Sequence, residues 1–157
     1  MSKININLKL FLVLIPILML VNCNKDNTNG YYNIPYVYVN KTINLELPSY
    51  SNLIPIGGYI VIGNVGYRGI IMYHSGPDEY IAIERACTYK PLDDCSVVTV
   101  DNSGTSLICG HYEGSDWIPC CDSKFSIDGY SIMNGPAQYP LEHYKVIITG
   151  NSLLVTN

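Results

Sequence analysis

The chain is poor in charged residues and in histidine, and these deficits exclude several classes of protein. Charged residues make up 14% of its 157 positions, and only three positions are histidine. Soluble domains carry about 25% charged residues on average. The net charge is −4 and no basic stripe occurs, so the chain is not expected to bind nucleic acid through its phosphates. P-loops, glycine-rich dinucleotide turns and His-Glu-x-x-His motifs are also missing.

Sequence patterns of the common hydrolases are missing as well. There is no G-x-S-x-G motif and no cysteine in a papain-like context. The acidic pair Asp93-Asp94 is typical of a solvated turn rather than of a two-carboxylate site. His74 and His143 lie near strand ends without a neighbouring thiol or carboxylate motif, so we expect them on the surface. The sequence therefore predicts no enzyme activity.

The N-terminal segment has the pattern of an export signal. Lys3 and Lys9 precede an apolar run over residues 10–21. At 12 residues this run is too short to span a bilayer of about 30 Å. The run ends in Leu20-Val21-Asn22-Cys23, which resembles a bacterial lipobox, although Asn22 replaces the usual small residue. We predict that residues 1–22 are a lipoprotein signal peptide and that Cys23 carries a lipid anchor.

A polar linker follows the predicted anchor. Residues 24–33 are rich in asparagine and nearly free of aliphatic side chains. Ten extended residues reach about 33 Å, enough to hold a small domain clear of lipid headgroups. We therefore predict a lipidated tether over residues 23–33. The expected location is the cell envelope, with the protein anchored in a membrane and facing the periplasm or the cell surface.

From residue 34 onward the pattern is that of β structure. The 14 tyrosines, 13 glycines and nine prolines favour strands and turns, and no window has a helical period. Short strands are expected at residues 36–39, 42–47, 59–62, 69–73, 80–83, 97–100, 105–109, 124–127, 144–148 and 153–156. We predict one all-β domain, a sandwich or barrel of antiparallel sheets, over residues 34–157.

Beyond the lipobox, five cysteines lie within 35 residues: Cys87, Cys95, Cys109, Cys120 and Cys121. An exported protein favours disulfides over free thiols, but an odd number leaves at least one thiol over. The adjacent Cys120 and Cys121 point in opposite directions if their loop is strand-like, so they serve different purposes. The cluster predicts either two loops joined by disulfides or a metal site.

The last of these cysteines begin a longer motif. Residues 120–141, CCDSKFSIDGYSIMNGPAQYPL, resemble the second cluster-binding segment of Rieske proteins, C-P-C-H-G-S-x-F followed by a D-G turn and G-P-A-x-x-P-L. Residues 86–89, ACTY, resemble the first segment, C-T-H, and residues 50–62 and 68–73 are similar to exported lipoproteins with Rieske-type domains. The resemblance covers about residues 34–157. It implies a Rieske-like antiparallel sandwich or barrel with a two-loop subdomain of the cluster-binding type.

The resemblance also implies a set of ligand positions. A Rieske [2Fe-2S] cluster takes two thiolates on one iron and two imidazoles on the other. Cys87 matches the first thiolate and is the one ligand retained in kind. Tyr89 stands at the first histidine position, Ile118 at the second thiolate position and Cys121 at the second histidine position. Cys121 remains a candidate ligand because thiolate binds iron well.

The surroundings of the ligands match better than the ligands themselves. Cys95 and Cys120 correspond to the pair that forms a loop-to-loop disulfide in many Rieske proteins. Ser123 corresponds to the hydroxyl that donates to a cluster sulfur. Gly135 and Pro136, with Ala137, correspond to the loop that shields the cluster from water. The resemblance thus implies a retained architecture around a degenerate ligand set.

The sequence allows several interpretations of Cys109. It is the missing thiolate if residues 110–118 are an insertion that loops out before Pro119. Otherwise it is a disulfide partner or a small core residue, because it ends an apolar strand. We interpret the Cys109-Gly-His111 spacing as coincidental. A second bridge between Cys87 and Cys121 is a further alternative.

Two functions are consistent with a retained architecture around a degenerate ligand set. The first is a lipoprotein whose cluster ligands are largely replaced and which works as a non-catalytic binding or structural protein with an unknown envelope partner. The alternative is an electron-transfer protein that holds a [2Fe-2S] cluster through unusual, thiolate-rich ligation. In that case Cys87, Cys109 and Cys121 are its candidate ligands.

Overall fold

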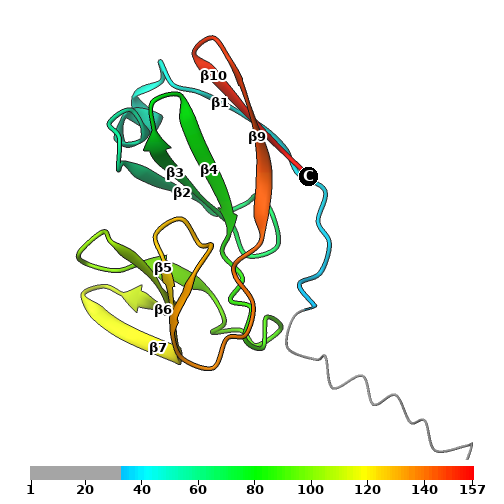
Figure 1. Ribbon diagram of the computed structural model, residues 1–157, viewed down its shortest axis with the longest axis vertical. Helices are drawn as coiled ribbons and strands as arrows, with labels where there is room; N and C mark the ends of the chain where they lie inside the picture. The colour runs from blue at the N-terminus through cyan, green and yellow to red at the C-terminus, as the bar shows by residue number, and fades with distance from the viewer. Residues whose placement is uncertain (1–32) are drawn as a thin grey trace, which may run out of the picture.

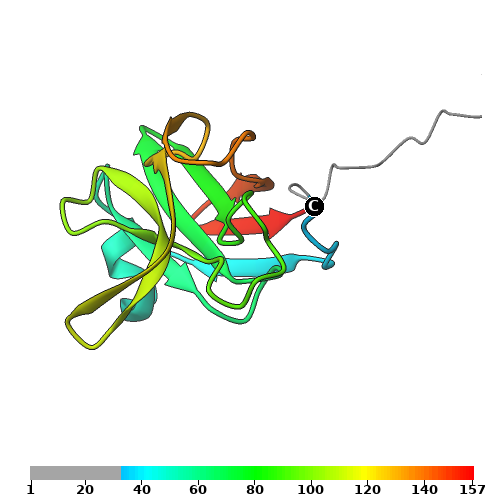
Figure 2. The same ribbon diagram turned by 90° about the horizontal axis from the view of Figure 1, so that it is seen from below.

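The computed structural model describes residues 33–157, and the predicted signal peptide, Cys23 and almost all of the tether lie outside this range. The described chain forms two antiparallel sheets, one of six strands in the order β1-β10-β9-β4-β3-β2 and one of four in the order β5-β6-β7-β8. Figure 1 shows the six-stranded sheet above the four-stranded one, and Figure 2 shows the same layers from below. The predicted all-β fold is confirmed.

The strands are β1 (Asn40–Asn44), β2 (Tyr59–Ile62), β3 (Ile70–Gly76), β4 (Glu79–Glu84), β5 (Val98–Val100), β6 (Ser106–Glu113), β7 (Asp116–Ser126), β8 (Ile132–Asn134), β9 (His143–Thr149) and β10 (Ser152–Thr156). A short 3-10 helix, η1 (Pro48–Leu53), joins β1 to β2. No helix among residues 33–157 has the length and apolarity needed to cross a membrane.

Three of the strand predictions were wrong in extent or position. Residues 36–39 are not a strand, and β1 begins at Asn40, where the chain first pairs with β10. The short, exposed β8 was not predicted. The strands expected at 105–109 and 124–127 are parts of β6 and β7, which extend into one long hairpin. Pairing with a partner strand, rather than local alternation, sets these boundaries.

The strand β3 lies between two hydrophobic cores. Successive side chains of a strand point to opposite faces, so Ile71 packs toward the four-stranded sheet while Ile70 and Met72 pack toward β1 and β10. The core shared with the four-stranded sheet contains Ile71, Ile83, Cys87, Val98, Val100, Leu107, Cys109, Phe125, Ala137 and Leu141. Strands β3 and β4 therefore contribute side chains to the core that contains Cys87 and Cys109.

A buried carboxylate fixes the end of β4, from which the first cysteine loop departs. Glu84 is fully buried and accepts hydrogen bonds from the backbone N–H groups of Tyr67 and Arg68, both at 2.8 Å, and of Ala86 at 2.9 Å. The Tyr144 hydroxyl donates a fourth bond of 2.6 Å. Burial and the neighbouring Glu84 carboxylate raise the pKa of Tyr144. These bonds hold β4, β9 and the β2–β3 connection together just before Cys87.

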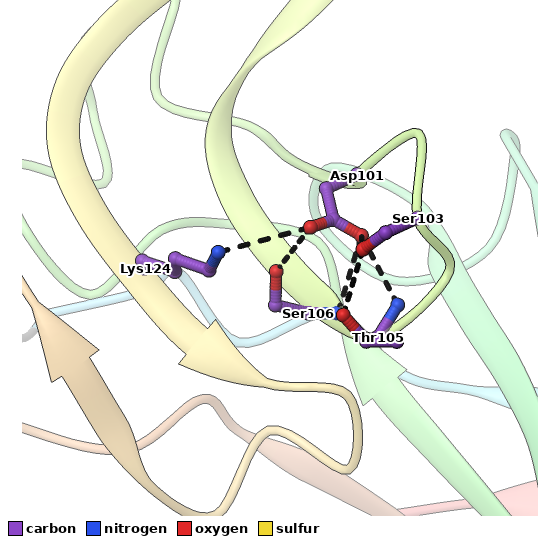
Figure 3. Close-up of polar contacts among 5 residues, drawn as sticks. All are labelled: Asp101, Ser103, Thr105, Ser106 and Lys124. Atoms are coloured by element: carbon purple, nitrogen blue, oxygen red, sulfur yellow. Dashed lines mark hydrogen bonds and ion pairs between the residues drawn. The ribbon is translucent and has the colours of Figure 1, made fainter.

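The turn between β5 and β6 is fixed by a second carboxylate (Figure 3). Asp101 accepts hydrogen bonds from the hydroxyls of Ser106, at 2.6 Å, and Ser103, at 2.8 Å, and from the N–H of Thr105 at 3.1 Å. Lys124 of β7 lies 3.8 Å from the same carboxylate. Burial opposes ionisation, but these hydrogen bonds lower the pKa of Asp101 to about 2. The network sets the register of the strands that carry Cys109 and Cys121.

The expectation of surface histidines was wrong for His74. Its side chain is buried, its Nδ1 lies 2.9 Å from the Ile54 carbonyl oxygen and its ring stacks on Tyr80 at 4.2 Å. His143 is half-buried, and its Nε2 lies 2.7 Å from the Asp128 carbonyl oxygen. Both imidazoles have structural roles that their positions near strand ends did not reveal.

Candidate metal centre

A wide bulge interrupts the hairpin of β6 and β7. On β6 the ladder skips a single residue, Cys109, whereas on β7 it skips residues 120–123. Beyond the bulge, residues 110–119 pair again as a projecting hairpin. Gly110, with φ at 143°, permits this geometry, because a Cβ there would collide with the Ile118 carbonyl and the Trp117 ring. Residues 110–118 thus loop out in the way that the thiolate interpretation of Cys109 requires.

The bulge brings three free thiols together. Cys87 opens the loop after β4, Cys109 lies in β6 and Cys121 lies in the bulge, and their Sγ atoms all lie within 4.8 Å of one another. The Cys87 and Cys121 sulfurs are 3.9 Å apart. The second bridge considered from sequence is therefore not formed, since a disulfide bond is about 2.05 Å long. Cys87 and Cys109 are buried and Cys121 is half-buried.

A disulfide joins the two loops that carry these thiols. Cys95, near the end of the first loop, is bonded to Cys120 of the bulge, with the Cα atoms 5.3 Å apart. The adjacent Cys120 and Cys121 thus take different roles, one in the disulfide and one among the thiols, as the sequence predicts. Within the first loop, the Cys87 N–H donates to the Ser96 carbonyl at 3.1 Å. The disulfide and this bond hold the first loop against the bulge.

A third segment, residues 135–139, covers the bulge from the other side. The Ala137 N–H donates to Ser123 Oγ at 3.1 Å, and Ser123 Oγ lies 3.2 Å from Cys121 Sγ. The Cys121 thiol donates in this contact, so Ser123 Oγ accepts from both Ala137 and Cys121. Once Cys121 is a thiolate, the Ser123 hydroxyl proton is free to donate to the sulfur. At Gly135, with φ at 91°, a Cβ would collide with the backbone of Asp122 and Ser123. The close approach of this loop therefore requires glycine at position 135.

The loop also contacts the first cysteine loop. Thr88 Oγ1 donates to the Tyr139 carbonyl oxygen at 2.7 Å. Pro136 is exposed, whereas Ala137 is buried in the core that contains Cys87 and Cys109. Ala137, rather than Pro136, is thus the residue of this segment that packs into the core holding the thiols.

The three thiols differ in acidity. Hydrogen bonds with Cys109 and Cys87, aided by Ser123, lower the pKa of Cys121. The bond with Cys121 and burial raise the pKa of Cys109. The pKa of Cys87 rises to about 11, because its bond with Cys121 and its burial outweigh the opposite effect of its bond with Cys109. Cys121 is therefore the first of the three to become a thiolate, stabilised by the other two thiols.

No imidazole among residues 33–157 joins the thiols, and the replaced Rieske positions have other surroundings. Tyr89 packs at the edge of the core, with Lys90 Nζ 5.5 Å from its ring centre. Ile118 is 36% exposed and pairs with His111 in the projecting hairpin. His111 Nε2 lies 3.3 Å from the carboxylate of Glu113. All three histidines lie within residues 33–157, and none belongs to the group of converging thiols.

A surface cleft of about 280 Å³ opens beside the thiols. Its lining residues are Ile108, Cys109, Trp117, Pro119, Cys121, Asp122, Ser123, Lys124 and Asn134. Sequence reasoning missed Trp117, which belongs to no motif, and Lys124, which stands at a variable position of the motif over residues 120–141. Only the bulge places both beside the site. The cleft gives solvent a path to Cys121 from the outer face of the four-stranded sheet.

These residues do not fit a Rieske [2Fe-2S] cluster. Such a cluster takes four ligands, two thiolates and two imidazoles. Among residues 33–157 the site presents three thiols, while Cys95 and Cys120 are bonded to each other. Two disulfide-linked loops and a covering glycine loop are present, as the sequence resemblance implies, but the four-ligand set of such a cluster is not.

The solved structures include a protein to which this chain is similar. The chain is similar to the cyanobacterial plasma membrane Rieske protein PetC3 from Synechocystis PCC 6803, with 20% identity and a TM-score of 0.47 over 78% of this chain and 100% of that chain. No protein-family model matches the chain. No curated protein matches it either.

Proposed function

We propose that this Rieske-like domain is an exported, lipid-anchored protein of the cell envelope that has lost the Rieske cluster and works as a non-catalytic binding or structural protein. The observation that carries the proposal is the set of three converging thiols at Cys87, Cys109 and Cys121, with no imidazole among them. Electron transfer through a Rieske centre depends on its imidazole ligands, which raise its potential. Without them, the retained loops serve as a scaffold.

The surface around the loops supports a binding role. Leu92 in the first loop is 63% exposed, Met133 of β8 is 59% exposed and Tyr139 of the covering loop is 41% exposed. The disulfide and the Thr88–Tyr139 bond hold the first and covering loops together. A contiguous exposed apolar patch is typical of a surface that contacts a partner, and we propose that these three side chains belong to one. The partner that we propose is another envelope protein.

The proposal is tested by analysing the full chain, purified in detergent after oxygen-free expression with iron and sulfide supplied. The measurements are the visible spectrum, total iron and acid-labile sulfide. We expect a folded, colourless protein without stoichiometric iron. An independent [2Fe-2S] ferredoxin produced in the same host shows that the supply of iron and sulfide is sufficient. A chromophore with stoichiometric iron and sulfide would contradict the loss of the cluster.

The second candidate function is electron transfer by a cluster with thiolate-rich ligation. The observation that favours it is the Ser123 hydroxyl beside Cys121, because hydrogen bonds to sulfur tune the potential of such centres. In this case the same preparation contains about two irons and two sulfides per chain. Cys87→Ser and Cys121→Ser would then bleach the chromophore, and an unchanged spectrum in these variants would exclude both ligands.

The lipid anchor is tested separately. Cys23→Ala removes the predicted lipidation site, so the protein should move from the membrane fraction to the soluble fraction of the envelope. Met19→Ala, within the predicted signal, is the matched control and should leave the mature protein in the membrane. Retention of the Cys23→Ala variant in the membrane would contradict the anchor.

A further inference from the structure

We infer that the three-thiol centre of Cys87, Cys109 and Cys121 binds a single Cu(I) ion, with all three sulfurs as ligands. This inference rests on the proposed loss of the cluster and identifies what the three remaining thiols bind instead.

The spacing of the sulfurs fits one ion. A metal–thiolate bond of about 2.3 Å places two sulfurs of the same ion about 3.8–4.0 Å apart. Cys87 and Cys121 are already 3.9 Å apart, and the three Sγ atoms all lie within 4.8 Å of one another. Small side-chain rotations are thus enough to place all three around one centre. A dinuclear cluster would instead need a fourth ligand and two separated pairs.

The donor set favours Cu(I) over other common ions. Thiolates select soft ions, which include Cu(I) and Zn(II), whereas Mg²⁺ and Ca²⁺ prefer oxygen. Zinc in structural sites is almost always bound by four ligands in a tetrahedron. Among residues 33–157, no histidine or carboxylate joins the three thiols in a shared coordination group. A trigonal set of three sulfurs suits Cu(I), which does not require a fourth ligand.

The surroundings can stabilise thiolates once an ion is bound. Ser123 Oγ lies 3.2 Å from Cys121 Sγ, so the Ser123 hydroxyl can donate to this sulfur once Cys121 has lost its proton. Donors to ligand sulfurs orient the ligands and support metal affinity.

The structure also provides a path for the ion and protects it from water. Cys121 and Cys109 both line the 280 Å³ cleft. Cys109 and Cys87 are nevertheless almost fully excluded from solvent. The segment of residues 135–139 covers Cys121 on the other side, and its Ala137 N–H is hydrogen-bonded to Ser123. An ion can therefore enter along the cleft and be held at its inner wall, away from bulk solvent.

The test is an oxygen-free titration of the full chain in detergent with Cu(I), in competition with a chromophoric Cu(I) chelator. Thiols are counted beforehand to show that Cys87, Cys109 and Cys121 are reduced. We expect one Cu(I) per chain, and X-ray absorption should show sulfur scatterers only. Failure to compete for stoichiometric Cu(I), or nitrogen or oxygen ligands in the absorption spectrum, would overturn the inference.

Variants connect the binding to these residues. Cys121→Ser, at the half-buried position, and Cys109→Ala, which keeps the core apolar, should each weaken Cu(I) binding by more than about 100-fold. Ser123→Ala should weaken it by about tenfold. His111→Ala removes a metal-binding side chain outside the centre and should leave Cu(I) binding unchanged. Copper retained by both folded cysteine variants would overturn the assignment, with folding checked by circular dichroism.

The result is separable from the test of the proposed function. A colourless, iron-free protein that also fails to take up Cu(I) would overturn the copper site and leave the loss of the cluster intact. Stoichiometric iron and labile sulfide would overturn both. A parallel titration with Zn(II) should show weaker competition, and preferential retention of Zn(II) over Cu(I) would count against the three-sulfur copper site.

Discussion

The core on the β1 and β10 side of the six-stranded sheet is aliphatic apart from Met72, whereas the core shared with the four-stranded sheet contains the buried thiols of Cys87 and Cys109. Both cores are equally well excluded from water, since their central residues are close to 0% exposed. The two regions thus obey the same packing rules but differ in chemical reactivity. Sulfur is concentrated in one of them, at the point where three loops meet.

This difference shows which features stabilise the fold and which prepare a site. A buried free cysteine packs as a small hydrophobe, so aliphatic residues could fill the same volume. The convergence of Cys87, Cys109 and Cys121 is therefore not needed for packing alone. In contrast, Glu84, the Cys95–Cys120 disulfide and the Asp101 turn fix the segments that deliver those thiols.

The largest expected effect comes from the buried carboxylate at the end of β4. Glu84→Ala leaves three backbone N–H groups and the Tyr144 hydroxyl without their acceptor, and should lower the free energy of unfolding by about 3–5 kcal/mol. Denaturant unfolding measures the change. Glu79→Ala, at the exposed start of β4, is the matched control. Equal stability of the two variants would contradict the role of Glu84.

Removing the disulfide should affect mainly the four-stranded region. The double variant Cys95→Ala/Cys120→Ala is expected to lose about 2–4 kcal/mol of stability, because the bond closes a long loop in the unfolded chain. Hydrogen exchange should show faster opening of β5–β7, with protection in β1, β9 and β10 retained. Uniform loss of protection across both sheets would show that the two regions unfold as one.

Matched truncations compare the two cores directly. Ile43→Ala in the aliphatic core should cost about 2–5 kcal/mol, as for other large-to-small core changes. Cys109→Ala should cost about 1 kcal/mol, since it removes a single buried atom. Thermal and denaturant unfolding of the metal-free protein give both values. A loss of stability for Cys109→Ala as large as that for Ile43→Ala would mean that the Cys109 thiol is needed for packing.

The smallest effect is expected from the Asp101 turn and depends on pH. Because hydrogen bonds lower the pKa of Asp101 to about 2, its ionised form stabilises the fold above the unfolded-state pKa of about 4. That stabilisation should be lost as the pH falls from about 4 to 2. Asp101→Asn should therefore unfold more easily at pH 7 and show a flatter pH dependence between pH 4 and 2. An unchanged acid profile would contradict the role of the turn.

Sequence alone was sufficient for the fold class and for part of the site. Alternation and turn signals located most strands, and the family resemblance implied the Cys95–Cys120 disulfide and a position for Ser123 beside the site. It could not decide the role of Cys109, because that depends on how residues 110–118 pair across a bulge. It also missed β8, which is short and exposed, and the burial of His74, which depends on a stack with Tyr80.

The three-thiol centre is tested most directly by determining which cysteines are free and which are bridged in the protein as isolated. The chain is alkylated without oxygen under denaturing, non-reducing conditions, digested and analysed by mass spectrometry. The account predicts one bridged peptide pair, Cys95–Cys120, and alkylation of Cys87, Cys109 and Cys121. A bridge between any two of those three, or a free Cys95 or Cys120, would contradict the three-thiol centre.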